Sequence, residues 1–172
     1  MKKLISLLSF LCVISLSAFV IDQNWILADN YTVRFSNPEV NGSFTKLNAT
    51  IRFDEKDLAA SRIQVSVDVN SVNTGNPEMD KQVTGKDMLN KEQYPQIIFE
   101  SSSLRKVPVG YEAIGTLKMH GQNKEITIPF TFSDQVFKGN FEVKCSDYGM
   151  TGMGHGEADV VKIELSVPVK AG

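Results

Sequence analysis

The sequence predicts an all-β domain of antiparallel strands, and three observations support this fold class. Apolar and polar residues alternate with a period of two along most of the chain, which marks strands with one buried face and one face in water. Turn-forming residues such as Asn41-Gly42-Ser43 and His120-Gly121 separate these runs and are expected to form hairpin loops. The 172 residues suit a single domain. Strands with one apolar face need either a second sheet or closure into a barrel.

The individual strands are recognised by apolar residues at alternate positions. They are expected over residues 31–35, 47–53, 63–69, 97–99, 126–132, 137–145 and 161–169. Residues 54–61 are expected to form a wider turn. Pro129 interrupts one run and indicates a strand edge or a bulge at that point. Residues 74–94 lack the alternation, and Asn76 followed by Pro77 is typical of a helix start, so one or two short helices are expected there.

The N-terminus follows a different pattern from the rest of the chain. Lys2 and Lys3 precede an uncharged, largely apolar stretch that contains small residues at its end. This arrangement predicts a secretory signal peptide over residues 1–21, with cleavage near residues 17–18, and a mature domain over residues 22–172. A retained membrane anchor is the alternative, since the stretch approaches the ~18 apolar residues of a span. Cleavage is favoured because four serines dilute the stretch, and it leaves no stable membrane span.

Composition and residue types argue against several classes of function. A net charge of −2 makes nucleic acid an unexpected partner. Two cysteines cannot build a disulfide-rich scaffold, and cleavage of the signal leaves only Cys145. The two histidines, His120 and His155, both lie beside glycines in expected turns, and no phosphate-binding loop precedes a helix. The sequence therefore predicts a protein that is not an enzyme.

A set of short motifs occurs in a characteristic order along the chain. The set comprises residues 53–61, 65–76, Asp80, residues 86–89, residues 94–101, residues 115–121 and Asp147-Tyr148-Gly149-Met150. In this order and spacing the motifs resemble the YceI-like family of polyisoprenoid-binding proteins, over roughly residues 27–169. The resemblance implies an eight-stranded antiparallel barrel of lipocalin-like shape with a short helical flap. It also implies export to the bacterial periplasm or beyond, and binding of a long apolar chain, such as a polyprenyl or quinone tail, inside the barrel.

The chain departs from the family pattern at three places. Met79-Asp80 keeps only the second member of an Arg-Asp pair that is common in the family. Gln82-Val83 stands where a His-Leu pair is expected, and Cys145 takes the place of an arginine. These differences leave the expected fold intact and concern the polar contacts of the family's pocket.

A barrel that binds an isoprenoid needs an elongated apolar cavity, because each buried methylene contributes about 0.8 kcal/mol. The candidate wall residues lie on the inward faces of the strands: Phe35, Phe53, Val65, Val67, Phe99, Leu117, Phe130, Phe141 and Val143. Four apolar residues of the flap are expected to form an adaptable lid: Met79, Val83, Met88 and Leu89. The alternative is that all of these side chains fill a solid core.

A second group of residues suggests a different hypothesis. Cys145, Met150, Met153 and His155 place thiol, thioether and imidazole groups close together in sequence, a donor set that soft metals such as copper prefer. A periplasmic redox or metal-handling protein is therefore one alternative, although Cys145 also continues the apolar face of a strand. A surface interaction module without a ligand is another. The sequence predicts no cofactor apart from a bound lipid, and it leaves a homodimer open.

Overall fold

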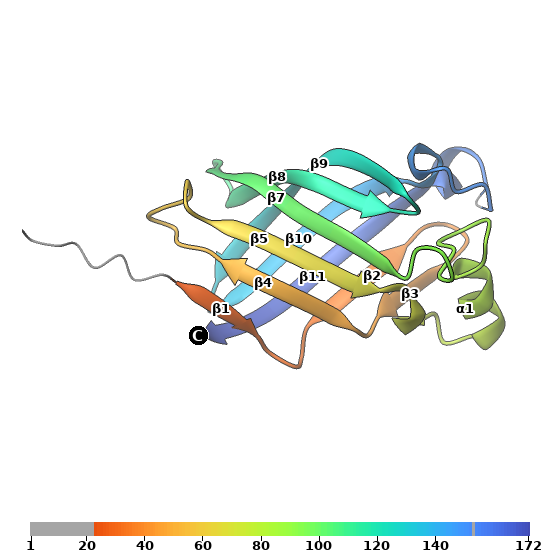
Figure 1. Cartoon of the computed structure of the whole chain (residues 1–172), viewed down its shortest axis with the longest axis horizontal. Helices are drawn as coiled ribbons and strands as arrows, with labels where there is room; N and C mark the ends of the chain where they lie inside the picture. Colours follow the sequence, from red (N-terminus) through yellow and green to blue (C-terminus); the bar gives the residue numbers. More distant parts are fainter. Residues whose placement is uncertain (1–22, 153) are drawn as a thin grey trace, which may run out of the picture.

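The computed structural model describes residues 23–152 and 154–172, and antiparallel strands dominate it (Figure 1). The strands are β1 (Asn24–Leu27), β2 (Thr32–Ser36), β3 (Asn41–Phe44), β4 (Leu47–Arg52), β5 (Arg62–Asp68), β6 (Val72–Asn73), β7 (Gln96–Lys106), β8 (Tyr111–Met119), β9 (Gln122–Ser133), β10 (Val136–Lys144) and β11 (Val160–Ala171). The helical elements are α1 (Pro77–Val83) and three 3-10 turns, η1 (Val69–Ser71), η2 (Cys145–Tyr148) and η3 (Gly156–Asp159). The signal peptide predicted over residues 1–21 lies outside the described residues.

The strands close into a barrel, because β1 pairs with both β4 and β11. Eight strands make the closed ring, in the order β1-β4-β5-β7-β8-β9-β10-β11. At one end the short strands extend the wall, since β11 also pairs with β2, β2 with β3, and β3 with β6. The structure therefore confirms the all-β, eight-stranded antiparallel barrel with a short helical flap. Eight strands leave an interior that side chains fill or that holds one small ligand.

The flap, which we define as residues 74–94, begins as the sequence predicts. The Asn76 side chain accepts a hydrogen bond from the Glu78 backbone N–H at 3.0 Å, and Pro77 occupies the first helical position. Asp80 holds helix α1 to the first residue of the flap, because its carboxylate accepts from both the backbone and the hydroxyl of Thr74. The helix ends at Val83, and residues 84–94 continue as turns.

Two local predictions need correction. Asn41-Gly42-Ser43 was expected to be a hairpin loop, but these residues form β3. The turn lies earlier, where the Asn37 side chain accepts from the Val40 backbone N–H at 2.8 Å. Gly42 serves close packing, since a Cβ there would lie 2.7 Å from the Phe35 ring. Strand β8 was not among the predicted runs, because small residues on its inward face weaken the alternation.

The core of the barrel has two parts. Six aromatic side chains pack at the end that carries both termini of the described chain, and we call this the aromatic end: Trp25, Phe53, Tyr111, Phe130, Phe132 and Phe137. The flap and the loops around η2 and η3 lie at the opposite end (Figure 1), which we call the flap end. Between the two ends the interior is lined mainly by aliphatic side chains.

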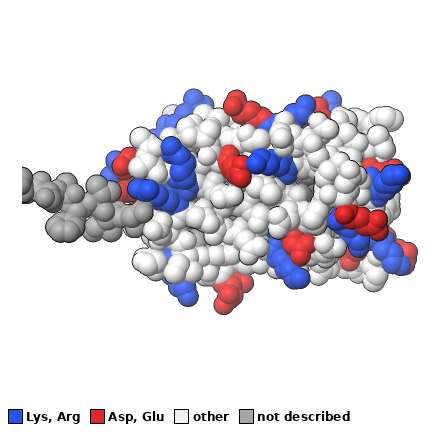
Figure 2. Space-filling model, viewed as in Figure 1, with Lys and Arg blue, Asp and Glu red and all other residues white. Residues whose placement is uncertain are grey.

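The outer surface carries mixed charge. Acidic and basic side chains are interspersed over the face shown in Figure 2. Within residues 23–152 and 154–172, no helix is both long enough and apolar enough to cross a membrane.

Candidate functional site

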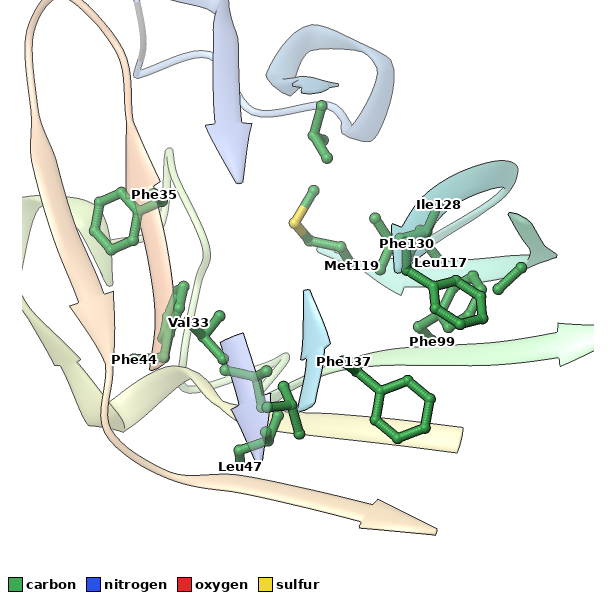
Figure 3. Packing of buried hydrophobic residues seen from close by; sticks show 14 of the residues in the cluster. Val33, Phe35, Phe44, Leu47, Phe99, Leu117, Met119, Ile128, Phe130 and Phe137 are labelled. Atoms are coloured by element: carbon green, nitrogen blue, oxygen red, sulfur yellow. The ribbon is translucent and has the colours of Figure 1, made fainter. Parts of the chain in front are cut away.

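An apolar cavity of about 210 Å³ occupies the barrel between its two ends. Figure 3 shows side chains from opposite walls, among them Phe35, Leu47 and Leu117, arranged around the barrel interior. Among the described wall residues Lys138 is the single charged one, and it is exposed on the outer surface. The remaining wall is built from aliphatic, aromatic and sulfur-containing side chains, so it suits an apolar ligand.

Most of the predicted wall residues line this cavity. On the strands these are Phe35, Val65, Val67, Phe99, Leu117, Phe130, Phe141 and Val143, and on the flap they are Val83, Met88 and Leu89. The period-two alternation located the strand residues among them, because inward positions in a barrel strand recur at every second residue.

Two predicted residues do not reach the cavity. Phe53 is 0% exposed and lies in the aromatic end, where the rings of Tyr111 and Phe137 approach it to 5.2 and 5.3 Å. Its neighbours close it off from the cavity. Met79 packs against the core but is not part of the wall, whereas Val83, on the same helix face one turn later, lines the cavity.

The wall also contains residues that were not predicted individually. They are Val33, Val40, Phe44, Leu47, Ala49, Ile51, Ile63, Ile97, Ala113, Met119, Ile128, Phe137, Cys145, Met150, Val161, Ile163, Leu165 and Val167. Many of them belong to the same alternating runs, as Ile63 does with Val65. Assigning every apolar residue of an inward face to the wall would therefore have predicted them. Met150 carries no such signal, because it lies in the loop after η2.

Several inward side chains are only half-buried although they point into the barrel. Ile63 and Val65 on β5, Ile163 and Leu165 on β11, and Phe141 on β10 all belong to this class. They border the cavity, whereas the side chains of the aromatic end border each other. Their side chains are partly exposed because they border unfilled space inside the barrel.

The aromatic end forms the floor of the cavity. Phe130 and Phe137 line the cavity on one side and pack against Phe53 on the other. Polar anchors hold this end in place, since Trp25 Nε1 donates to the Phe53 carbonyl oxygen at 2.9 Å. The Tyr111 hydroxyl donates to the carboxylate of Glu55, and this bond raises the pKa of Tyr111 to about 12.

The flap closes the opposite end. Val83, Met88 and Leu89 are buried beneath it, each less than one tenth exposed. The backbone N–H groups of Thr151 and Gly152 both donate to the Asp87 carbonyl oxygen at 2.9 Å, which fastens the flap to the loop after η2.

The hairpin between β8 and β9 lies beside the flap and is attached to η2. His120 Nδ1 lies 2.8 Å from the Tyr148 carbonyl oxygen, and the His120 ring packs edge-on against Tyr94 at 5.3 Å. The Tyr148 hydroxyl is buried and has no hydrogen-bond partner among the described residues. Burial, and then the charge of Asp147, raises the pKa of this hydroxyl.

The Cys/Met/His group is only partly brought together. Cys145 and Met150 are buried and line the cavity, whereas His155 is exposed and Met153 lies outside the described residues. Burial, followed by the charge of Asp159, raises the pKa of Cys145 to about 11, which keeps the thiol protonated. Metal ligation needs the thiolate. Among the described residues, no cluster of three or more His, Cys, Asp or Glu side chains is placed to hold a metal ion.

Asp159 stabilises the loop that follows β10. Its carboxylate accepts from the Ser146 backbone N–H at 2.8 Å and from the Ser146 hydroxyl at 2.6 Å, so it joins η3 to η2. These hydrogen bonds lower the pKa of Asp159. The role of this carboxylate is therefore to shape the flap end, next to Cys145 and Met150.

Known proteins with similar sequences and structures match this architecture. A UPF0312 protein of Yersinia pestis (strain Pestoides F) is 33% identical over 120 residues, which are 64% of this chain and 62% of that protein. The match therefore spans less than two thirds of the relative's own length. The crystal structure of Burkholderia cenocepacia BcnA superposes with a TM-score of 0.76 at 26% identity, covering 84% of this chain and 99% of that one.

Two further solved structures share the fold. The Campylobacter jejuni YCEI protein has a TM-score of 0.66 at 22% identity and covers 80% of this chain and 87% of its own. A polyisoprenoid binding domain from Saccharophagus degradans has a TM-score of 0.63 at 16% identity, covering 88% of this chain and 99% of its own. The profile of the YceI-like domain matches residues 25–170, which include every strand of the barrel except the margins of β1 and β11. The chain therefore belongs to the YceI-like domain family.

Proposed function

We propose that this protein is an exported lipid carrier that holds a long-chain isoprenoid, such as a polyprenyl or quinone tail, in its barrel cavity. The observation that carries the proposal is the apolar cavity of about 210 Å³, enclosed between the aromatic end and the flap. Lys138 is the single charged residue of its described wall and lies at the outer surface. Such a wall offers an apolar tail favourable burial and offers a polar ligand few hydrogen bonds.

The physical driving force is the burial of hydrocarbon. At about 0.8 kcal/mol per methylene, a tail of a few isoprene units gains enough to bind tightly without a polar anchor. Branched tails also suit an irregular cavity, and Met88, Met119 and Met150 supply flexible side chains around its flap end. The polyisoprenoid-binding structure from Saccharophagus degradans supports this ligand class, since its barrel superposes on this one.

The location and role of the carrier form part of the same proposal. The two lysines and the apolar stretch at the N-terminus support export, to the periplasm of a bacterium or beyond. A carrier there keeps an apolar lipid out of water during transport, storage or a stress response. N-terminal sequencing of the exported protein is expected to begin between residues 18 and 22, whereas a protein that starts at Met1 and stays in the membrane contradicts export.

The proposal is tested by identifying the natural ligand. The protein is purified from its native host without detergent, extracted with organic solvent and analysed by mass spectrometry. We expect one long-chain isoprenoid or quinone per chain. Stoichiometric copper with no lipid would favour the metal-handling alternative, and an empty protein that binds neither would favour a surface interaction module.

A matched pair of variants tests whether the lipid occupies the cavity. Val65 lies on the inward face of β5 and lines the cavity, so Val65→Trp is expected to fill the space and abolish lipid binding. Gln64 is exposed on the outer face of the same strand, so Gln64→Trp is the control and is expected to retain the lipid. Equal lipid content in both variants contradicts binding inside the barrel.

A further inference from the structure

The barrel wall contains a break in its hydrogen bonding between β9 and β10. These two strands pair only from Val136↔Ser133 to Gly139↔Phe130. Beyond that point β9 remains paired with β8 as far as Gln122, and β10 remains paired with β11 as far as Lys144. We call the unpaired stretches 122–129 and 140–144 together the β9–β10 seam.

Pro129 explains why the ladder stops where it does. The two-residue turn between β9 and β10, with both residues at positive φ, makes Ser133 and Val136 a hydrogen-bonded pair. Backbone groups of β9 that face β10 then recur at Thr131 and at Pro129. Proline has no N–H, so the next pair, Pro129 with Asn140, loses one of its two backbone hydrogen bonds. Pro129, where the sequence predicted a strand edge or a bulge, is thus at the end of the β9–β10 pairing and causes no bulge in its pairing with β8.

The described residues do not bridge the seam. Between residues 122–129 and 140–144 of the described chain there is no strand pairing, side-chain hydrogen bond or ion pair. The wall has a shorter interruption between β4 and the β1–β2 loop, but a side chain spans that one. The Tyr31 hydroxyl donates to the Thr45 carbonyl oxygen at 2.8 Å and accepts from the Leu47 backbone N–H at 3.0 Å.

The barrel wall is thin at the start of the seam. Lys138 points outward from β10, yet it borders the cavity together with Gly139, which has no side chain to close the wall. Farther along, Ile128 on β9 and Phe141 and Val143 on β10 also line the cavity, and Phe141 is only half-buried. Apolar side chains therefore border the seam on both sides.

Both ends of the barrel are held more firmly than the seam. Opening the aromatic end would separate packed rings around Phe53, which is 0% exposed. Opening the flap end would expose Met88 and Leu89 and break the two hydrogen bonds to the Asp87 carbonyl oxygen. Separating the seam breaks no ladder pair and no side-chain hydrogen bond between described residues, and the side chains that border it line the cavity.

We propose that the lipid tail enters and leaves the cavity sideways, by parting β9 from β10 along the seam, while the flap stays closed. This inference rests on the proposed function, because it requires an apolar ligand in the cavity. In this route, Pro129 is the residue that prevents the β9–β10 pairing from extending along the seam. The polar head of the lipid would remain outside the wall, near Lys138, during transfer.

The test bridges the seam and measures transfer of a lipid probe. In a Cys145→Ala background, Thr127→Cys with Glu142→Cys places two thiols on the exposed outer face, one on each side of the seam. A reducible bis-maleimide joins them. The matched control, Ser133→Cys with Val136→Cys, is joined where the strands are already paired. The probe is a geranylgeranyl chain with a fluorescent head group, transferred to phosphatidylcholine vesicles.

We expect the seam bridge to slow transfer at least about tenfold, mainly through the dissociation rate, and reduction of the bridge to restore the rate. The control bridge should leave the rate unchanged. Pro129→Val supplies the missing N–H without any bridge, so it should also slow transfer while leaving equilibrium affinity close to the parent value. Pro168→Val is its control, since Pro168 lies in β11 opposite the already paired end of β10.

Two outcomes would overturn the inference, and they are distinguishable. Normal binding and normal transfer with the seam bridged would reject the lateral route, most clearly if a bridge from Asp87→Cys to Thr151→Cys at the flap slowed transfer instead. Failure of the unmodified protein to bind the probe at equilibrium would reject the proposed function, and the lateral route with it.

Discussion

The aromatic end and the hollow part of the barrel are built on the same strands but filled differently. At the aromatic end Phe53 is surrounded by the rings of four other aromatic residues at centroid distances of 5.2 to 5.6 Å. In the hollow part the inward positions of β5 and β11 carry Ile63, Val65, Ile163 and Leu165, and a cavity of about 210 Å³ remains between them.

The difference shows that side-chain size decides whether a section of the barrel is solidly packed or encloses a cavity. Large rings from several strands meet across the barrel at one end and leave no space, with Phe53 completely buried. Branched aliphatic side chains are too short to meet across the same diameter, so each stays half-buried beside the cavity. The aromatic end then supplies stability while the hollow part accepts a ligand.

The largest effect is expected at the aromatic end. Phe53→Ala removes the ring at the centre of the cluster and leaves a void that its neighbours cannot fill. The free energy of unfolding should fall by about 3–5 kcal/mol, measured by urea denaturation of the lipid-free protein. A loss below about 1 kcal/mol would mean that the aromatic end collapses around the void and is not a rigid floor.

The same substitution in the hollow part should cost less. Phe141 already borders empty space, so Phe141→Ala loses fewer contacts and should lower the free energy of unfolding by less than about 2 kcal/mol. Affinity for an isoprenoid should fall clearly, since one wall of the site is removed. If Phe141→Ala destabilises the lipid-free protein as much as Phe53→Ala does, the two regions do not differ in packing.

A smaller and pH-dependent effect is expected at the flap end. The pKa of Asp159 is lowered by its hydrogen bonds to Ser146, so the ionised carboxylate stabilises the folded state. That stability is present above the unfolded pKa of about 4 and is lost as the pH falls through the folded value. Asp159→Asn should therefore cost about 1 kcal/mol at pH 7.

The measurement for Asp159 is thermal or urea unfolding as a function of pH. The difference between the parent protein and Asp159→Asn should begin to shrink below about pH 4, where the carboxylate takes up a proton in the unfolded state, and should disappear once the pH falls through the lower folded value. A difference that stays constant down to pH 2.5 would show that charge is not the cause.

The smallest effect on stability is expected at the Tyr148 hydroxyl. It is buried without a partner in the described chain, so Tyr148→Phe removes an unsatisfied polar group and should leave the free energy of unfolding unchanged or slightly higher. Calorimetry of the lipid-free protein measures this change. A loss of more than about 1 kcal/mol would show that the hydroxyl has a partner, such as a bound water, in solution.

The sequence by itself determined the strand alternation, the flap start and an irregularity in the strand at Pro129, expected as an edge or a bulge. These features depend on neighbours in the chain: which face of a strand is apolar, which side chain caps a helix, and which residue lacks an N–H. For this reason most of the predicted wall residues line the cavity. The strand β8 was not predicted, because Ala113 and Gly115 on its inward face are too small to give a clear alternation of apolar and polar residues.

Only the tertiary structure decided which inward residues form a solid core and which form the wall of the cavity. Phe53 and Phe141 occupy equivalent positions in alternating runs, yet one is enclosed by rings and the other borders the cavity. The pairing of β1 with β11 and the direction in which Pro129 breaks the wall are likewise long-range properties. The physical reason is that the filling of a barrel depends on side chains that meet across its diameter, and these come from strands far apart in the sequence.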